Sequence, residues 1–112
     1  MTSTKQHIAV VDDEVEGREM IGEYLALHDY RVSLCDGGAS LRELMSRDVP
    51  DLIILDLNMP EEDGLSIVRW MKQLLDLALQ VADASAGTPL RDVAREAADR
   101  LRRGVVAYSS VS

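Results

Sequence analysis

The sequence predicts an α/β domain built on a parallel sheet, and two observations support this class. Short apolar runs alternate with longer segments whose apolar residues recur at helical spacing. Two of the apolar runs, 8–11 and 52–55, end directly in aspartate, which strands disfavour. An aspartate at that point marks where a buried strand reaches the surface. We therefore expect parallel strands joined by right-handed helical crossovers, with helices on both faces of the sheet.

The first two thirds of the chain divide clearly into elements. In order, we expect strand 7–11, helix 15–28, strand 31–35, helix 40–47, strand 52–55 and a helix that begins at residue 65. Asp36-Gly37-Gly38 is a turn signal that closes the second strand, and Pro50-Asp51 ends the second helix. Strand 52–55 is uniformly apolar, as expected of a central parallel strand that is covered on both faces.

The last third is harder to assign. Thr88 and Pro89 suit the cap and the first turn of a helix, and apolar residues follow at helical spacing, so we expect a helix over 88–103. Gly104 would end it, and residues 105–108 form a candidate last strand. The stretch 75–87 has two alternatives: it extends the preceding helix, or it holds a short strand around 79–84.

Length and composition narrow the class of protein. A chain of 112 residues is expected to form one domain, 1–112, and a net charge of −8 argues against direct binding of nucleic acid. Cys35 is the single cysteine, no apolar run approaches the length of a membrane span, and no signal peptide is apparent. We therefore expect a cytoplasmic protein without membrane contact. Residues 1–73 hold 15 acids and 7 bases, whereas residues 74–112 hold five of each.

Three aspartates form the strongest candidate site. Asp12 and Asp13 follow the first strand, and Asp56 follows the third. If these strands are parallel neighbours, the three carboxylates converge at one edge of the sheet. Carboxylates a few ångströms apart repel one another strongly, and a divalent cation between them relieves that repulsion. The sequence therefore predicts a cation site at this edge.

Two motifs carry a family resemblance. One is Val11-Asp12-Asp13-Glu14, and the other is residues 55–64, in which an aspartate is followed by Met-Pro and then Asp-Gly at set offsets. Residues 7–73 thereby resemble the receiver domain of two-component response regulators. The resemblance implies a doubly wound, flavodoxin-like fold with strand order 2-1-3-4-5. Residues 74–112 match poorly, so we expect an incomplete or altered C-terminal third.

The resemblance also implies a role for each residue of the site. Asp56 would be the phosphoacceptor and would also contact Mg²⁺. Asp13 would bind Mg²⁺ directly, Asp12 directly or through water, and Asn58 through its backbone carbonyl. The phosphoryl donor would be a sensor histidine kinase. Such a domain would not be an enzyme beyond self-catalysed phosphotransfer and autodephosphorylation.

Two further positions of the family are matched less well. Ser85 lies 29 residues after Asp56, about where the family has a hydroxyl residue that ends strand 4 and binds the phosphoryl group. The family's lysine after strand 5 has no counterpart in residues 109–112, although residues 104–108 resemble the approach to it. The fifth helix of the family also has no counterpart.

These departures leave three functional alternatives and one expectation about assembly. The chain is a phosphoacceptor domain, a pseudo-receiver that works only through protein contacts, or a truncated or composite receiver whose tail after residue 73 has another origin. Without a fifth helix, apolar surface would stay open on Ile8, Val10, Leu34 and residues 105–106. We therefore expect either a symmetric homodimer or a shift of helix 88–103 into the vacant place.

Overall fold

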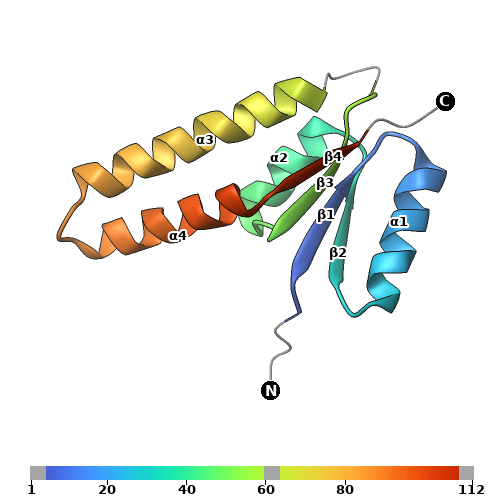
Figure 1. The fold of residues 1–112 in the computed structure, drawn as a ribbon, viewed down its shortest axis with the longest axis horizontal. Coiled ribbons are helices and arrows are strands. Elements are labelled where there is room, and N and C mark those ends of the chain that lie inside the picture. Colours follow the sequence, from blue (N-terminus) through green and yellow to red (C-terminus); the bar gives the residue numbers. More distant parts are fainter. Residues whose placement is uncertain (1–4, 60–63, 109–112) are drawn as a thin grey trace.

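The structure is a computed structural model that describes residues 5–59 and 64–108. Its four strands are parallel and form one sheet in the order β2-β1-β3-β4 (Figure 1). The strands are β1 (His7–Val11), β2 (Arg31–Cys35), β3 (Leu52–Asp56) and β4 (Val105–Tyr108). The helices are α1 (Val15–Leu27), α2 (Gly38–Arg47), α3 (Gly64–Ala84) and α4 (Pro89–Arg103). The predicted parallel α/β class is confirmed.

The core lies around the two central strands. All five residues of β1 are buried, and from β3 the core takes Ile53, Leu55 and Asp56. Leu41 and Leu44 reach this core from α2, and Ile67 and Met71 reach it from α3. The apolar run of β1 is covered on both faces, as expected of a central parallel strand, whereas Leu52 and Ile54 leave one face of β3 partly open.

The expected open surface is only partly present. Ile8 and Val10 are 4% and 0% exposed, so the expectation that they would stay open was wrong. Leu34 and Val106 are 47% and 53% exposed, which agrees with the expectation at these two positions. Both residues belong to the outer strands β2 and β4. The open apolar surface therefore lies on the outer strands of the sheet and not on β1 at its centre.

The C-terminal third is altered in a specific way. No strand forms at residues 79–84, because α3 continues through them as a single helix of 21 residues. The stretch 74–84 is rich in alanine and leucine and contains Val81 as its only β-branched residue, so helix propensity prevails. The strand at 105–108, expected as the fifth, is therefore the fourth in the described chain. It pairs directly with β3 from Ile53↔Val105 to Asp56↔Tyr108.

Helices α3 and α4 form a hairpin that extends beyond the sheet (Figure 1). A helix of 21 residues is about 32 Å long, whereas a five-residue strand spans about 17 Å. Gly87 has a φ of 84° in the turn, a conformation that glycine adopts at little cost. Helix α4 lies along α3 and does not cover the α1 side of the sheet, so the expected shift into the vacant place is not realised. None of the helices in the described ranges is long and apolar enough to cross a membrane.

Candidate functional site

The three predicted acids converge at the carboxyl end of the central strands. Asp12 follows β1 directly and Asp56 is the last residue of β3, and these two strands pair in parallel up to Val11↔Leu55. One carboxylate oxygen from each of Asp12, Asp13 and Asp56 lies within 4.8 Å of the other two. Asp12 and Asp56 are buried, with exposed fractions of 2% and 0%, whereas Asp13 is exposed.

Backbone amides hold the two buried carboxylates in place. The N–H of Asn58 donates to Oδ1 of Asp56 at 2.9 Å, and the N–H of Glu14 donates to Oδ1 of Asp12 at 2.9 Å. In both cases the donor is two residues further along the chain, so each aspartate closes a local turn as its strand ends. The turns fix the orientations of the two carboxylate side chains.

Two more side chains reach Asp12. The guanidinium of Arg18, on α1, donates to the backbone carbonyl of Asp12 at 2.7 Å. The hydroxyl of Tyr108, at the end of β4, donates to Oδ2 of Asp12 at 2.6 Å. Burial raises the pKa of Tyr108, and the hydrogen bond to Asp12 raises it further, so this hydroxyl stays protonated.

Sequence reasoning missed the contact between Tyr108 and Asp12. The sequence predicts a last strand at 105–108 but no contact between Tyr108 and Asp12, whereas the structure pairs Tyr108 with Asp56 across β3 and β4. The signal that could have found the contact is positional. A strand that neighbours β3 in parallel must bring its last residue to the edge of the sheet where Asp56 lies.

Small residues let two helices approach the site closely. A Cβ added to Gly17, on α1, would lie 3.2 Å from Oδ2 of Asp12. A Cβ added to Gly64, the first residue of α3, would lie 2.6 Å from Cα of Leu57 and 3.1 Å from the backbone oxygen of Asp56. A side chain at Gly64 would collide with backbone, so the start of α3 is fixed against the end of β3.

The donor set fits a hard divalent cation. All the candidate ligands are oxygen atoms, which Mg²⁺ prefers. The three carboxylate oxygens lie within 4.8 Å of one another, so Asp12, Asp13 and Asp56 could together hold one such ion. The backbone N–H of Asn58 donates to Asp56, and this hydrogen bond keeps the backbone carbonyl of Asn58 in the loop that follows Asp56.

The structure does not bring Ser85 to the acids. Ser85 lies in the turn between α3 and α4, where its hydroxyl donates to the backbone carbonyl of Val81. Its predicted position at the end of a strand is therefore wrong, because that strand does not form. Residues 109–112, in which a lysine was sought, and residues 60–63 of the second motif lie outside the described residues.

Comparisons with known proteins find similarity to receiver domains. The family model for the response regulator receiver domain matches residues 8–99. The regulatory protein TorR of Escherichia coli K12 is 39% identical over 67 residues, which are 60% of this chain and 29% of TorR. The regulatory protein GltR of Pseudomonas aeruginosa is 35% identical over 78 residues, which are 70% of this chain and 32% of GltR. The chain thus spans about a third of the length of these relatives.

Solved structures with a similar fold are also receiver proteins. A response regulator receiver protein from Pseudomonas putida has a TM-score of 0.61 and 24% identity, over 96% of this chain and 86% of that one. A crystal structure of the histidine kinase ThkA in complex with the response regulator protein TrrA gives a TM-score of 0.56 and 30% identity. That match covers 93% of this chain and 86% of the matched chain.

Proposed function

Because the chain belongs to the response regulator receiver domain family, we propose that it accepts a phosphoryl group on Asp56 with the help of Mg²⁺. The observation that carries the proposal is the convergence of the Asp12, Asp13 and Asp56 carboxylates within 4.8 Å at one edge of the sheet. The donor is a sensor histidine kinase, which the similarity to a regulator in complex with such a kinase supports. The chain acts in the cytoplasm as an acceptor and not as a turnover enzyme.

Each residue of the site has a defined task in this proposal. A carboxylate oxygen of Asp56 attacks phosphorus, and the new P–O bond forms as the P–N bond to the donor imidazole breaks, with its electron pair staying on nitrogen. The Asn58 N–H holds Asp56 in one orientation, and Asp12, Asp13 and the Asn58 carbonyl hold the metal. Bound Mg²⁺ would neutralise charge on the transferring oxygens. Because Asp56 is fully buried, the side chains around it must open for transfer.

A second candidate is a pseudo-receiver that binds other proteins without taking phosphate. Three observations favour it. Asp56 has no exposed surface. Ser85 lies in the turn between α3 and α4 and not at the end of a strand. Asp12 accepts a hydrogen bond from the neutral hydroxyl of Tyr108. In this case the acids only fix the ends of β1 and β3.

Intact-mass spectrometry with a small-molecule phosphodonor separates the two candidates. The parent chain is expected to gain one phosphoryl group with Mg²⁺ and none with a chelator. Asp56→Asn keeps the shape of the side chain but removes the nucleophile, so the adduct should disappear. Asp76→Asn, an exposed position on α3, is the matched control and should keep it.

The outcomes are distinct. An adduct that is labile in base and absent from Asp56→Asn supports phosphoacceptance, because acyl phosphates are base-labile. A parent chain that never gains phosphate, with either the small-molecule donor or a phosphorylated kinase, favours the pseudo-receiver. An adduct that persists in Asp56→Asn assigns the acceptor to another residue.

A further inference from the structure

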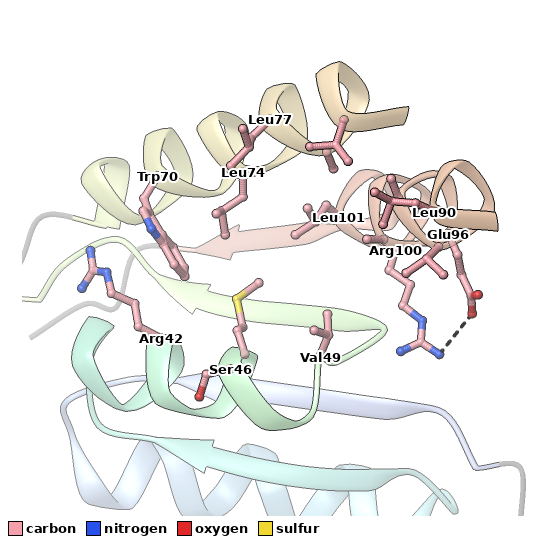
Figure 2. A pocket seen from close by; sticks show the side chains of 16 residues that line it. Arg42, Ser46, Val49, Trp70, Leu74, Leu77, Leu90, Glu96, Arg100 and Leu101 are labelled. Atoms are coloured by element: carbon pink, nitrogen blue, oxygen red, sulfur yellow. Dashed lines mark ion pairs between the residues drawn. The ribbon is translucent and has the colours of Figure 1, made fainter. Parts of the chain in front are cut away.

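Two surface cavities of the described chain do not lead to Asp56. One is a groove of about 700 Å³ between α2 and the α3–α4 hairpin, which Trp70, Leu74 and Leu101 line with other apolar side chains (Figure 2). The other lies between α1 and β2, against Leu34. None of the three acids of the site lines either cavity. Because Asp56 has no exposed surface, a side chain that covers it must move before a reactant can approach.

The side chain of Tyr108 lies across the end of β3. Tyr108 ends β4 and pairs with Asp56, the last residue of β3. Its hydroxyl nevertheless donates to Oδ2 of Asp12, which follows β1 on the other side of β3. Neighbouring strands are about 4.8 Å apart, so a contact between β4 and the end of β1 has to span about 10 Å. The ring of Tyr108 therefore passes over the end of β3, where Asp56 lies.

Tyr108 can move more easily than the other described groups around Asp56. The start of α3 is fixed, because a Cβ on Gly64 would already lie 2.6 Å from Cα of Leu57. Tyr108, in contrast, belongs to an edge strand, and its side chain is only half-buried. The N–H of Leu57 donates to the backbone carbonyl of Tyr108 at 2.7 Å, so the strand stays paired when the side chain rotates. The hydroxyl is held by its hydrogen bond to Asp12 at 2.6 Å.

We propose that the hydrogen bond from the Tyr108 hydroxyl to Asp12 holds the ring over Asp56, and that rotation of the ring gives the phosphodonor access. We call this contact the tyrosine latch. The latch rests on the proposed function, since Asp56 needs access only if it takes phosphate. A hydrogen bond to a charged, buried acceptor is stronger than one between neutral groups, so the closed ring is favoured. Tyr108 is thus a positioning residue, which controls access and takes no part in the transfer itself.

Carbodiimide coupling to glycinamide measures access to Asp56 on the full chain, and peptide mass spectrometry gives the rate at each carboxylate. Tyr108→Phe keeps the ring but removes the hydroxyl. Coupling at Asp56 should become roughly tenfold faster, because a hydrogen bond to a charged group is worth at least about that factor in the opening equilibrium. Asp76, exposed on α3, should couple equally fast in every chain. Tyr24→Phe makes the same change at a position that is 62% exposed on α1, and should leave the rate at Asp56 unchanged.

The thiol of Cys35 distinguishes opening of the latch from loosening of the whole fold. Cys35 is the single cysteine, ends β2 and is 3% exposed within the core. A maleimide therefore modifies it only when the core opens. The thiol should react at the same rate in the parent chain and in Tyr108→Phe, because rotation of one ring leaves the core closed.

Three results would overturn the latch. The first is coupling at Asp56 that is equally fast in the parent chain and in Tyr108→Phe. The second is a gain at Asp56 that Cys35 matches, because the variant has then loosened the whole fold. The third is a parent chain that takes phosphate from a small-molecule donor as fast as Tyr108→Phe does. Faster coupling at Asp56 with an unchanged rate at Cys35 supports the latch even where no chain takes phosphate. Failure of the latch and failure of phosphoacceptance are therefore separate results.

Discussion

Residues 7–59 and residues 64–103 bury their apolar side chains in different ways. In the first part, β1 and β3 run through the centre of the sheet, and Val10, Val11 and Leu55 have no exposed surface. In the hairpin, the buried hydrophobic residues outside the main core cluster are small, namely Ala82, Ala94 and Ala98. The first part is a layered core, whereas the hairpin is two helices in contact along one side.

This difference determines where a rigid site can form. The acidic residues follow β1 and β3, the two strands that the core holds most firmly, so their carboxylates are placed by the sheet itself. The hairpin contributes to the site only where it joins the sheet. Gly64 lies against the end of β3, and β4, the strand that follows α4, carries Tyr108. The proposed chemistry therefore belongs to the first part, and the hairpin is available for contacts with other chains.

Truncation of one leucine in each part is expected to give the largest contrast. Leu55→Ala removes a fully buried side chain of β3 and should lower the free energy of unfolding by about 2–5 kcal/mol. Leu77→Ala makes the same chemical change on α3 at a position that is 56% exposed, and should cost less than about 1 kcal/mol. Urea unfolding, at a protein concentration where the chain is monomeric, measures both. Equal losses would contradict the distinction between the two parts.

The sequence allowed the first part to be predicted almost completely. Strands 7–11 and 31–35 have the predicted bounds, and α1 begins at Val15 as expected and ends one residue earlier. In each of these elements the apolar residues recur with a period that fits either a strand or a helix but not both. Each element also ends at a strong turn signal. The convergence of Asp12, Asp13 and Asp56 followed from the same strand ends, because parallel neighbours share an edge.

The C-terminal third was not predicted uniquely, because apolar spacing alone did not decide it. Residues 79–84 have apolar spacings that suit a strand or a helix, and only their composition, rich in alanine and leucine, favours the helix that forms. The position of Ser85 was also predicted wrongly, because it was inferred from the number of residues between Asp56 and Ser85. That number places Ser85 at the end of a strand only if the chain returns to the sheet, and α3 instead continues as one helix of 21 residues.

Metal binding should stabilise the first part by a smaller amount. A ligand that binds only the folded state stabilises it by about 1.4 kcal/mol at ten times its dissociation constant. The thermal midpoint should therefore rise with Mg²⁺ and return to its starting value with a chelator. Asp13→Asn removes an exposed ligand and should abolish most of the rise, whereas Asp76→Asn on the hairpin should keep it. An unchanged midpoint in the parent chain would refute the metal site.

The pH dependence of stability near neutrality is the smallest expected effect, and it also belongs to the first part. His7 begins β1 at the edge of the sheet opposite the acids and is 1% exposed, with Nε2 at 2.7 Å from the hydroxyl of Ser33. Its backbone N–H donates to Asp51. Burial lowers the pKa of His7 below its ordinary value of 6.5, and Arg31 lowers it further, whereas Asp48 and Asp51 oppose the shift. The folded chain therefore keeps His7 neutral.

The sign of the effect follows from proton binding. Below pH 6.5 the unfolded chain binds a proton at His7 that the folded chain does not yet bind, so stability falls as the pH decreases through this value. The full contribution of neutral His7 to stability is present above pH 6.5. Once the pH is below the lowered pKa of His7 in the folded state, no further stability is lost through this residue. His7→Gln cannot titrate and keeps a polar group near Ser33, so urea unfolding of this variant should change less between neutral and mildly acidic pH. Exposed carboxylates titrate at lower pH and affect both chains alike. If the two chains lost stability equally over this interval, the pH dependence would have to come from groups outside the buried start of β1.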